Sequence, residues 1–210
     1  MKIIVTRPAD QAAPLAHRLQ ELGHEVVLCP LIRSEALSDE PLDLSGYDWV
    51  VVTSSNGAAE LARRARGELP AVAAIGPGTA ESLRERGIEP ALVPRVSTQE
   101  GLLAELPRGV RVVLVAAEGA RRLLVDELDA GFIAVYRTME LEPGSPPDGD
   151  LAVLASPSAA RAFAKLRLDI PVVSIGPHTT TAAVEAGLRV VAEAGTHDLE
   201  GLVSAVAEAG

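Results

Sequence analysis

Two turns of the same composition, one hundred residues apart, carry residue types suited to holding an anion. They are Ile75-Gly76-Pro77-Gly78-Thr79 and Ile175-Gly176-Pro177-His178-Thr179. Each follows a short apolar run and precedes a segment with helical spacing, so each is predicted to connect a strand to a helix. The backbone N–H groups at a helix start are unpaired and favour a negatively charged ligand. The sequence therefore predicts two anion-binding turns in a chain that contains an internal repeat.

Small hydroxyl residues gather at these turns and at other predicted strand ends, including Thr6-Arg7-Pro8, Thr53-Ser54-Ser55-Asn56-Gly57 and Ser156-Pro157-Ser158. The candidate binding residues are Arg7, Ser54, Ser55, Asn56, Thr79, Ser156, Ser158, Gly176, His178, Thr179 and Thr180. Capping of a helix is the alternative role for any single Ser or Thr, and it suits Ser55 and also Ser97, which would form a capping box with Glu100. Taken together at equivalent strand ends, the hydroxyl groups indicate a site for polar, anionic material.

Two residues could take part in proton transfer. Tyr136 ends a predicted strand and is followed by Arg137. It is either a packed aromatic residue or a neutral hydroxyl that donates to a leaving group. His178 is either an exposed residue at a helix start or a general base. No Ser lies in a GxSxG turn, so the sequence has no sign of a serine hydrolase.

The motifs do not predict a cofactor or a metal site. Gly76-Pro77-Gly78 differs from a dinucleotide fingerprint because it follows a middle strand, Pro77 removes a backbone donor, and the second copy has His178 in place of a glycine. No GxxxxGK[ST] motif occurs. Cys29 is the single cysteine, and the four histidines are scattered along the chain.

Composition excludes further function classes. The formal net charge is −10 and aromatic residues make up 2% of the chain, whereas proteins that bind nucleic acid have a basic face and often aromatic stacking platforms. The apolar runs are too short to span a membrane. The chain enters a strand within its first residues with no pattern of a signal peptide. A cytoplasmic protein with neither a nucleic-acid nor a membrane partner is expected.

The elements that position these turns form two sets of five predicted strands, each alternating with helices. One set begins near residues 2, 25, 151, 172 and 189, and the other near residues 111, 131, 48, 71 and 90. The predicted fold is α/β, with two flavodoxin-like parallel-sheet domains joined by a two-stranded linker, the central domain being inserted into the other. The expected domains are 1–33 plus 149–210 and 46–137, with paired linkers 34–45 and 138–148. Ligands of such sheets bind outside the carboxyl ends of the strands, so a cleft lined by the turns is expected.

The motifs, in their order and spacing over essentially all 210 residues, resemble those of the uroporphyrinogen-III synthase family. The matching segments are Val5-Thr6-Arg7-Pro8, Thr53-Ser54-Ser55-Asn56-Gly57, Ile75-Gly76-Pro77 with Thr79, Val135-Tyr136-Arg137-Thr138, Ile175-Gly176-Pro177 with Thr179, and Glu200-Gly201-Leu202. The resemblance implies two α/β domains joined by a two-stranded ladder, which agrees with the permuted repeat.

The resemblance also implies an activity. Enzymes of this family close the linear tetrapyrrole hydroxymethylbilane with loss of water and inversion of the last pyrrole ring, using no metal and no organic cofactor. The small-molecule substrate carries many carboxylates, and the hydroxyl turns would surround them, with Tyr136 near the leaving hydroxyl. The upstream enzyme that produces hydroxymethylbilane is a candidate partner. The alternative is a non-catalytic two-domain ligand-binding or regulatory module.

One turn departs from the family pattern. Many relatives carry a basic residue in the turn after the strand at 111–115, where this chain has Ala116-Ala117-Glu118-Gly119. Arg121 or Arg122 is therefore the expected replacement for a carboxylate contact there.

Overall fold

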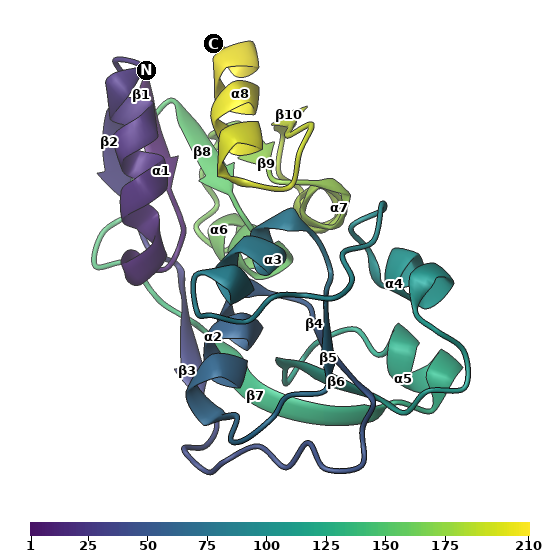
Figure 1. Ribbon diagram of the computed structural model, residues 1–210. Helices are drawn as coiled ribbons and strands as arrows, with labels where there is room; N and C mark the ends of the chain where they lie inside the picture. The colour runs from purple at the N-terminus through teal and green to yellow at the C-terminus, as the bar shows by residue number, and fades with distance from the viewer. The chain divides into compact units, whose positions relative to one another are not determined.

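The structure is a computed structural model that describes residues 1–210 (Figure 1). The chain divides into two compact units. The first unit consists of Met1–Arg33 and Met139–Gly210, and the second unit consists of Ser34–Thr138. Each unit contains a five-stranded sheet with helices on both faces, so the fold is mixed α/β with largely parallel sheets, as the alternation of strands and helices predicts.

The sheet of the first unit has the order β10-β9-β8-β1-β2, and all of its neighbouring strands are parallel. Its strands are β1 (Lys2–Val5), β2 (Glu25–Leu28), β8 (Leu151–Leu154), β9 (Val172–Ser174) and β10 (Val190–Glu193). The central strands β1, β8 and β9 are mostly apolar and buried because helices cover both of their faces. The predicted strand that begins near residue 189 corresponds to β10.

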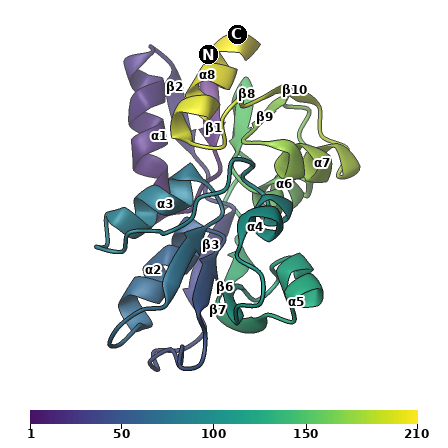
Figure 2. The same cartoon turned by 45° about the vertical axis from the view of Figure 1, so that its right-hand side comes forward.

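Four helices cover this sheet. One face packs against α1 (Ala9–Glu21) and α8 (Leu199–Ala209), and the other packs against α6 (Pro157–Ala164) and α7 (Pro177–Glu185). Figures 1 and 2 both show α6 and α7 side by side. In α1 the buried residues Ala12, Leu15 and Leu19 fall on one stripe, as in an amphipathic helix.

The sheet of the second unit has the order β3-β7-β6-β4-β5. Its strands are β3 (Ile32–Ala36), β4 (Trp49–Val52), β5 (Ala71–Ala74), β6 (Val112–Ala117) and β7 (Gly131–Glu140). A fifth strand from residue 90 onward was expected beside β5, and this expectation is wrong, because the segment contributes only an isolated bridge between Leu92 and Ala73. The proline-containing sequence Pro90-Ala91-Leu92-Val93-Pro94 limits further pairing there. The fifth strand is β3, at the opposite edge.

Helices α2 (Ser55–Arg64) and α3 (Pro77–Arg84) cover one face of this sheet, and α4 (Gln99–Glu105) and α5 (Leu123–Leu128) cover the other. The expected helix caps are each displaced by one residue. Ser54, not Ser55, caps α2, and Thr98, not Ser97, caps α4. In both cases the capping oxygen accepts the N–H of a glycine three residues later, which is the geometry of an N-cap.

The two connecting segments of the chain pair with each other through β3 and β7. The Leu37 N–H donates to the Val135 carbonyl at 3.1 Å, and the Leu141 N–H donates to the Leu31 carbonyl at 2.8 Å. As residue numbers rise along one strand they fall along the other, so this pair is antiparallel, unlike its neighbours. None of the helices is long and apolar enough to cross a membrane.

Candidate functional site

Parallel strands end at the same edge of their sheet, and most of the candidate residues lie at these carboxyl edges. In the first unit this edge carries Arg7 after β1, Ser156 and Ser158 after β8, and Gly176, His178, Thr179 and Thr180 after β9. In the second unit it carries Ser54, Ser55 and Asn56 after β4, Thr79 after β5, and Tyr136 on β7. The structure therefore gathers the candidates into one set per unit.

A β-bulge on β7 determines where Tyr136 points. The register pairs Ala116 with Ala134 and then Ala117 with Tyr136, so Val135 is an extra residue on β7. Alternation would otherwise put Val135 and Tyr136 on opposite faces of the sheet. Because of the bulge, both side chains contact the core beneath α2 and α3. Bulges of this kind often redirect a side chain beside a functional site.

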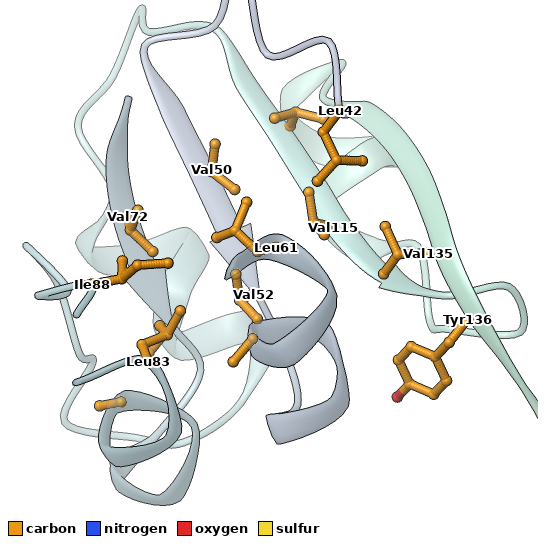
Figure 3. Packing of buried hydrophobic residues seen from close by; sticks show 14 residues of the cluster. Leu42, Val50, Val52, Leu61, Val72, Leu83, Ile88, Val115, Val135 and Tyr136 are labelled. Atoms are coloured by element: carbon orange, nitrogen blue, oxygen red, sulfur yellow. The ribbon is translucent and has the colours of Figure 1, made fainter. Parts of the chain in front are cut away.

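Figure 3 shows the result of this bulge. The Tyr136 ring lies at one end of the cluster beyond Val135, far from Val72 and Ile88 at the other end. Tyr136 is 8% exposed, so the ring belongs to the core while the hydroxyl lies at its boundary. The interpretation as a packed aromatic residue thus holds for the ring, and the oxygen faces polar neighbours; its donation to a leaving group stays a prediction.

The Tyr136 hydroxyl lies 3.0 Å from the Ser54 Oγ. Ser54 is the N-cap of α2, and the same Oγ accepts the Gly57 N–H at 3.0 Å. Burial raises the pKa of the Tyr136 phenol, and hydrogen bonds from the Ser54 and Asn56 side chains oppose this rise. The phenol is consequently neutral near pH 7 and can act as a hydrogen-bond donor.

The neighbours of Ser54 have different environments. Ser55 is the first residue of α2 and its side chain is exposed. The Asn56 amide nitrogen donates to the Ser34 Oγ at 2.6 Å, which ties the start of α2 to the connecting strand β3. Thr79 is buried in the first turn of α3. Of these residues, Asn56 is therefore the one held by a hydrogen bond to another element.

In the first unit Ser156 and Ser158 start α6. Ser156 is its N-cap, and its Oγ accepts the Ala159 N–H at 3.1 Å. Ser158 is half-buried in the first turn. Capping, the alternative role weighed for each single hydroxyl, thus applies to Ser156 as it does to Ser54.

The turn at Gly176 contains a hydrogen-bonded chain of side chains. Ser174 and Thr180 lie with their hydroxyl oxygens 2.6 Å apart, and Thr180 donates to the Glu193 carboxylate. Since a threonine hydroxyl has one proton, this bond leaves Thr180 no proton for a ligand in the present arrangement. Thr179 is 2% exposed, whereas His178 is exposed on the first turn of α7.

Arg7 has no hydrogen-bond or ion-pair partner, although it is half-buried. Burial lowers the pKa of its guanidinium, and the Asp10 carboxylate partly offsets this effect. Arginine nevertheless remains charged at any physiological pH. Its position after β1 therefore offers a positive charge, only partly offset by Asp10, at the carboxyl edge of the sheet.

The residue pattern that carries this geometry is matched by a known protein family. The profile described as uroporphyrinogen-III synthase HemD matches residues 13–204. The chain belongs to the uroporphyrinogen-III synthase family. The resemblance read from the motifs is thereby confirmed, and an enzyme of tetrapyrrole biosynthesis is favoured over a non-catalytic module.

Individual relatives agree with this assignment. A protein of Archaeoglobus fulgidus, provisionally described as a uroporphyrinogen-III synthase, is 33% identical over 90% of this chain and 91% of its own length. A Methanocaldococcus jannaschii protein with the same provisional description is 28% identical over 68% of this chain, an alignment that spans only 64% of that relative. The solved uroporphyrinogen-III synthetase of Helicobacter pylori has a TM-score of 0.64 at 16% identity and covers 99% of this chain and 98% of its own. The structural likeness supports the fold.

His197 was not among the residues predicted from the sequence and Ser97 was expected only to cap a helix, although both lie at the carboxyl edges. A Cβ atom added to Gly176 would lie 2.7 Å from the His197 ring, and one added to Gly76 would lie 2.6 Å from the Ser97 Oγ. His197 and Ser97 thus occupy equivalent places against the glycine of each repeat. The hundred-residue offset that relates the two glycines also relates Ser97 to His197, so the repeat already contained this signal.

The structure also separates Arg121 from Arg122, which the sequence could not do. The Arg121 guanidinium pairs with the Glu100 carboxylate at 2.5 Å. The Arg122 guanidinium instead lies over the Phe132 ring, 4.2 Å from its centroid, with no carboxylate partner. A stacked guanidinium keeps its N–H edges free for an anion.

Other features lie apart from these residues. Surface depressions of about 470 Å³ in the first unit and about 460 Å³ in the second have none of the candidate residues in their walls. No group of three or more His, Cys, Asp or Glu side chains is arranged to hold a metal ion. The candidate site in each unit is therefore the open edge of a sheet.

Proposed function

We propose that this chain catalyses the uroporphyrinogen-III synthase reaction, in which hydroxymethylbilane loses water and closes with inversion of its last pyrrole ring to give uroporphyrinogen III. The observation that carries the proposal is the redirected, neutral Tyr136 hydroxyl beside Ser54 at the carboxyl edge of its sheet, in a chain of this family. In this role Tyr136 donates to the departing hydroxyl group.

Substrate carboxylates are held, in this proposal, by the strand-end turns. The residues assigned to binding are Arg7, Ser54, Ser55, Asn56, Thr79, Ser156, Ser158, Gly176, His178, Thr179 and Thr180. In this assignment Thr180 exchanges its bond to the Glu193 carboxylate for one to the substrate. The support is the location of these residues at the carboxyl edges, beside the amino ends of the helices that follow, and the charge of Arg7, which has no ion-pair partner. Most of the catalytic effect then comes from holding a flexible, reactive molecule in the closing geometry.

We further propose that each unit is a flavodoxin-like domain, the central one (46–137) being inserted between residues 1–33 and 149–210. Numbered within its own repeat, the first sheet has the order 2-1-3-4-5, from β2 through β1, β8 and β9 to β10. The second sheet follows the same order through β7, β6, β4 and β5, with the bridge at Leu92 in the fifth place. The two connecting segments, 34–45 and 138–148, would then act as paired linkers.

A cytoplasmic location is proposed because the single cysteine, Cys29, is a free thiol, as is usual in reducing compartments. The enzyme that produces hydroxymethylbilane is a proposed partner, since direct transfer would limit the time for uncatalysed closure. Transfer predicts that adding the two enzymes together yields more type III isomer than adding them in sequence.

The decisive experiment supplies purified protein with hydroxymethylbilane and separates the oxidised products by isomer. Production of the type III isomer, well above the protein-free control, is the expected result. If only the symmetric type I isomer appears, the proposed activity is wrong and the chain is better regarded as a binding module.

A further inference from the structure

Ser54 is held in place from two sides. Its Oγ accepts the Gly57 N–H at 3.0 Å and lies 3.0 Å from the Tyr136 hydroxyl. Gly57 is buried, and a Cβ at that position would lie 3.2 Å from both the Ser54 Oγ and the Val115 carbonyl oxygen. The first turn of α2 thus has little room to shift relative to β6, and the serine oxygen is fixed before any ligand arrives.

The protons of this pair can be counted. A hydroxyl group has one proton and two acceptor positions. One acceptor position of Ser54 is occupied by the Gly57 N–H. If Tyr136 donates to Ser54, the tyrosine has no proton left for a substrate. If Ser54 donates to Tyr136, the phenolic proton is free to point out of the pair.

We propose that Ser54 is the positioning residue that donates to Tyr136 and thereby turns the phenolic proton toward the leaving hydroxyl. This inference rests on the proposed function, and it gives Ser54 a role different from a direct contact with a substrate carboxylate. A donated hydrogen bond also stabilises the phenolate that develops as the proton leaves, which burial alone would disfavour. Asn56 adds a second hydrogen bond to the same oxygen.

Three substitutions at Ser54 separate positioning from capping. Ser54→Thr keeps both the cap and the donor, and kcat is expected to stay within about threefold of the wild type. Ser54→Asp keeps the cap but, when ionised, only accepts hydrogen bonds, so it draws the Tyr136 proton away from the substrate. Ser54→Ala removes cap and donor together. For both Asp and Ala, kcat is expected to fall about tenfold, the effect of one ordinary hydrogen bond. For Ala, which adds no charge, KM is expected to change little.

Thr98 provides the matched control, because it caps α4 through a bond of 3.1 Å from the Gly101 N–H and is not part of the proposed site. Thr98→Ala is expected to lower the melting temperature without changing kcat. Wild-type kcat in Ser54→Asp would overturn the proposal. So would a large rise in KM with unchanged kcat, because that result would mean a direct contact with an anionic group of the substrate.

A double-mutant cycle shows whether Ser54 acts through Tyr136. In a Tyr136→Phe background, Ser54→Ala is expected to cause no further loss of kcat. An equal loss in both backgrounds would show that Ser54 acts independently of Tyr136 and would refute the inference.

A second measurement does not depend on turnover. In a Tyr47→Phe background only Tyr136 titrates as a tyrosine, and Ser54→Ala is expected to raise its titration midpoint, followed by ultraviolet absorbance. If the wild type makes no type III isomer, the proposed function fails while this measurement still tests the hydrogen bond. An unchanged midpoint would count against donation by Ser54.

Discussion

Replacing Tyr136 by Phe removes one oxygen atom from the site while leaving the ring in the core. The ring packs among Val135 and the residues beneath α2, so the substitution preserves the apolar contacts. The Ser54 Oγ keeps its bond from the Gly57 N–H and continues to cap α2. The variant is therefore expected to fold, with a loss of stability of about 1 kcal/mol for the missing hydrogen bond.

The expected effect on catalysis is larger than the effect on stability. A positioned proton donor contributes about 10² to 10⁴ in rate, and the lower value corresponds to about 2.7 kcal/mol of the activation free energy. The substrate carboxylates are assigned to other residues, so KM is expected to change by less than about threefold for Tyr136→Phe. Uncatalysed closure then competes better, and the share of the type I isomer should rise.

The assay combines initial rates with isomer analysis of the oxidised products. Tyr47→Phe is the matched control, since Tyr47 is the other tyrosine of the chain and lies beside Gly131 at the amino end of β7. This control is expected to retain the wild-type isomer ratio and rate. Full activity in Tyr136→Phe, or the same loss in both variants, would refute the proton-donor role.

Three further outcomes are expected. The raised pKa of folded Tyr136 means that the unfolded chain ionises first, near its usual value of about 10. Stability is therefore complete below that pH and falls as the pH rises toward the folded pKa, and urea denaturation at several pH values should show a smaller alkaline loss in Tyr136→Phe. Gly201→Ala should lower the free energy of unfolding by about 3 kcal/mol, because the new Cβ would lie 2.0 Å from a backbone carbonyl oxygen. Gly195→Ala, whose new Cβ would lie in open space, should leave the free energy of unfolding unchanged, and chemical denaturation measures both. Arg122→Gln should raise KM about fivefold through loss of a carboxylate contact. Arg108→Gln, at the opposite end of β6, should leave KM unchanged. Equal KM values in the two variants would argue against a substrate contact at Arg122.

The repeated glycine turns made much of this architecture predictable. Glycine and proline marked the strand-to-helix turns, and apolar runs such as Leu151–Leu154 became buried parallel strands. The segment after Pro90 does not form a regular strand, because an apolar run between two prolines has few N–H groups that can bond to the neighbouring strand. The caps at Ser54 and Thr98 were each displaced by one residue, since adjacent hydroxyl residues satisfy the same sequence pattern.

The site was less predictable than the fold. Tyr136 could be named because it ends the predicted strand, although that predicted end is wrong, since β7 continues to Glu140 in its pairing with β3. Its contact with Ser54 spans 82 residues and depends on how two strands pair. The bulge at Val135 has no local signature, because the sequence around it is a continuous apolar run. The hydrogen bond from Thr180 to the Glu193 carboxylate likewise joins α7 to β10, and no sequence motif predicts this contact.

The extra residue at Val135 decides on which side of the sheet the Tyr136 hydroxyl lies. In a regular ladder of the same length, Tyr136 would lie on the opposite side of the sheet from Val135, toward α4 and α5. Deletion of one residue between Phe132 and Tyr136 would remove the bulge and leave the tyrosine opposite Ala117 on its present side, whereas deletion of two residues would bring it opposite Ala116 and turn it toward α4 and α5. The length of this short stretch, and not its hydrophobicity, therefore sets the side of the sheet on which the hydroxyl lies.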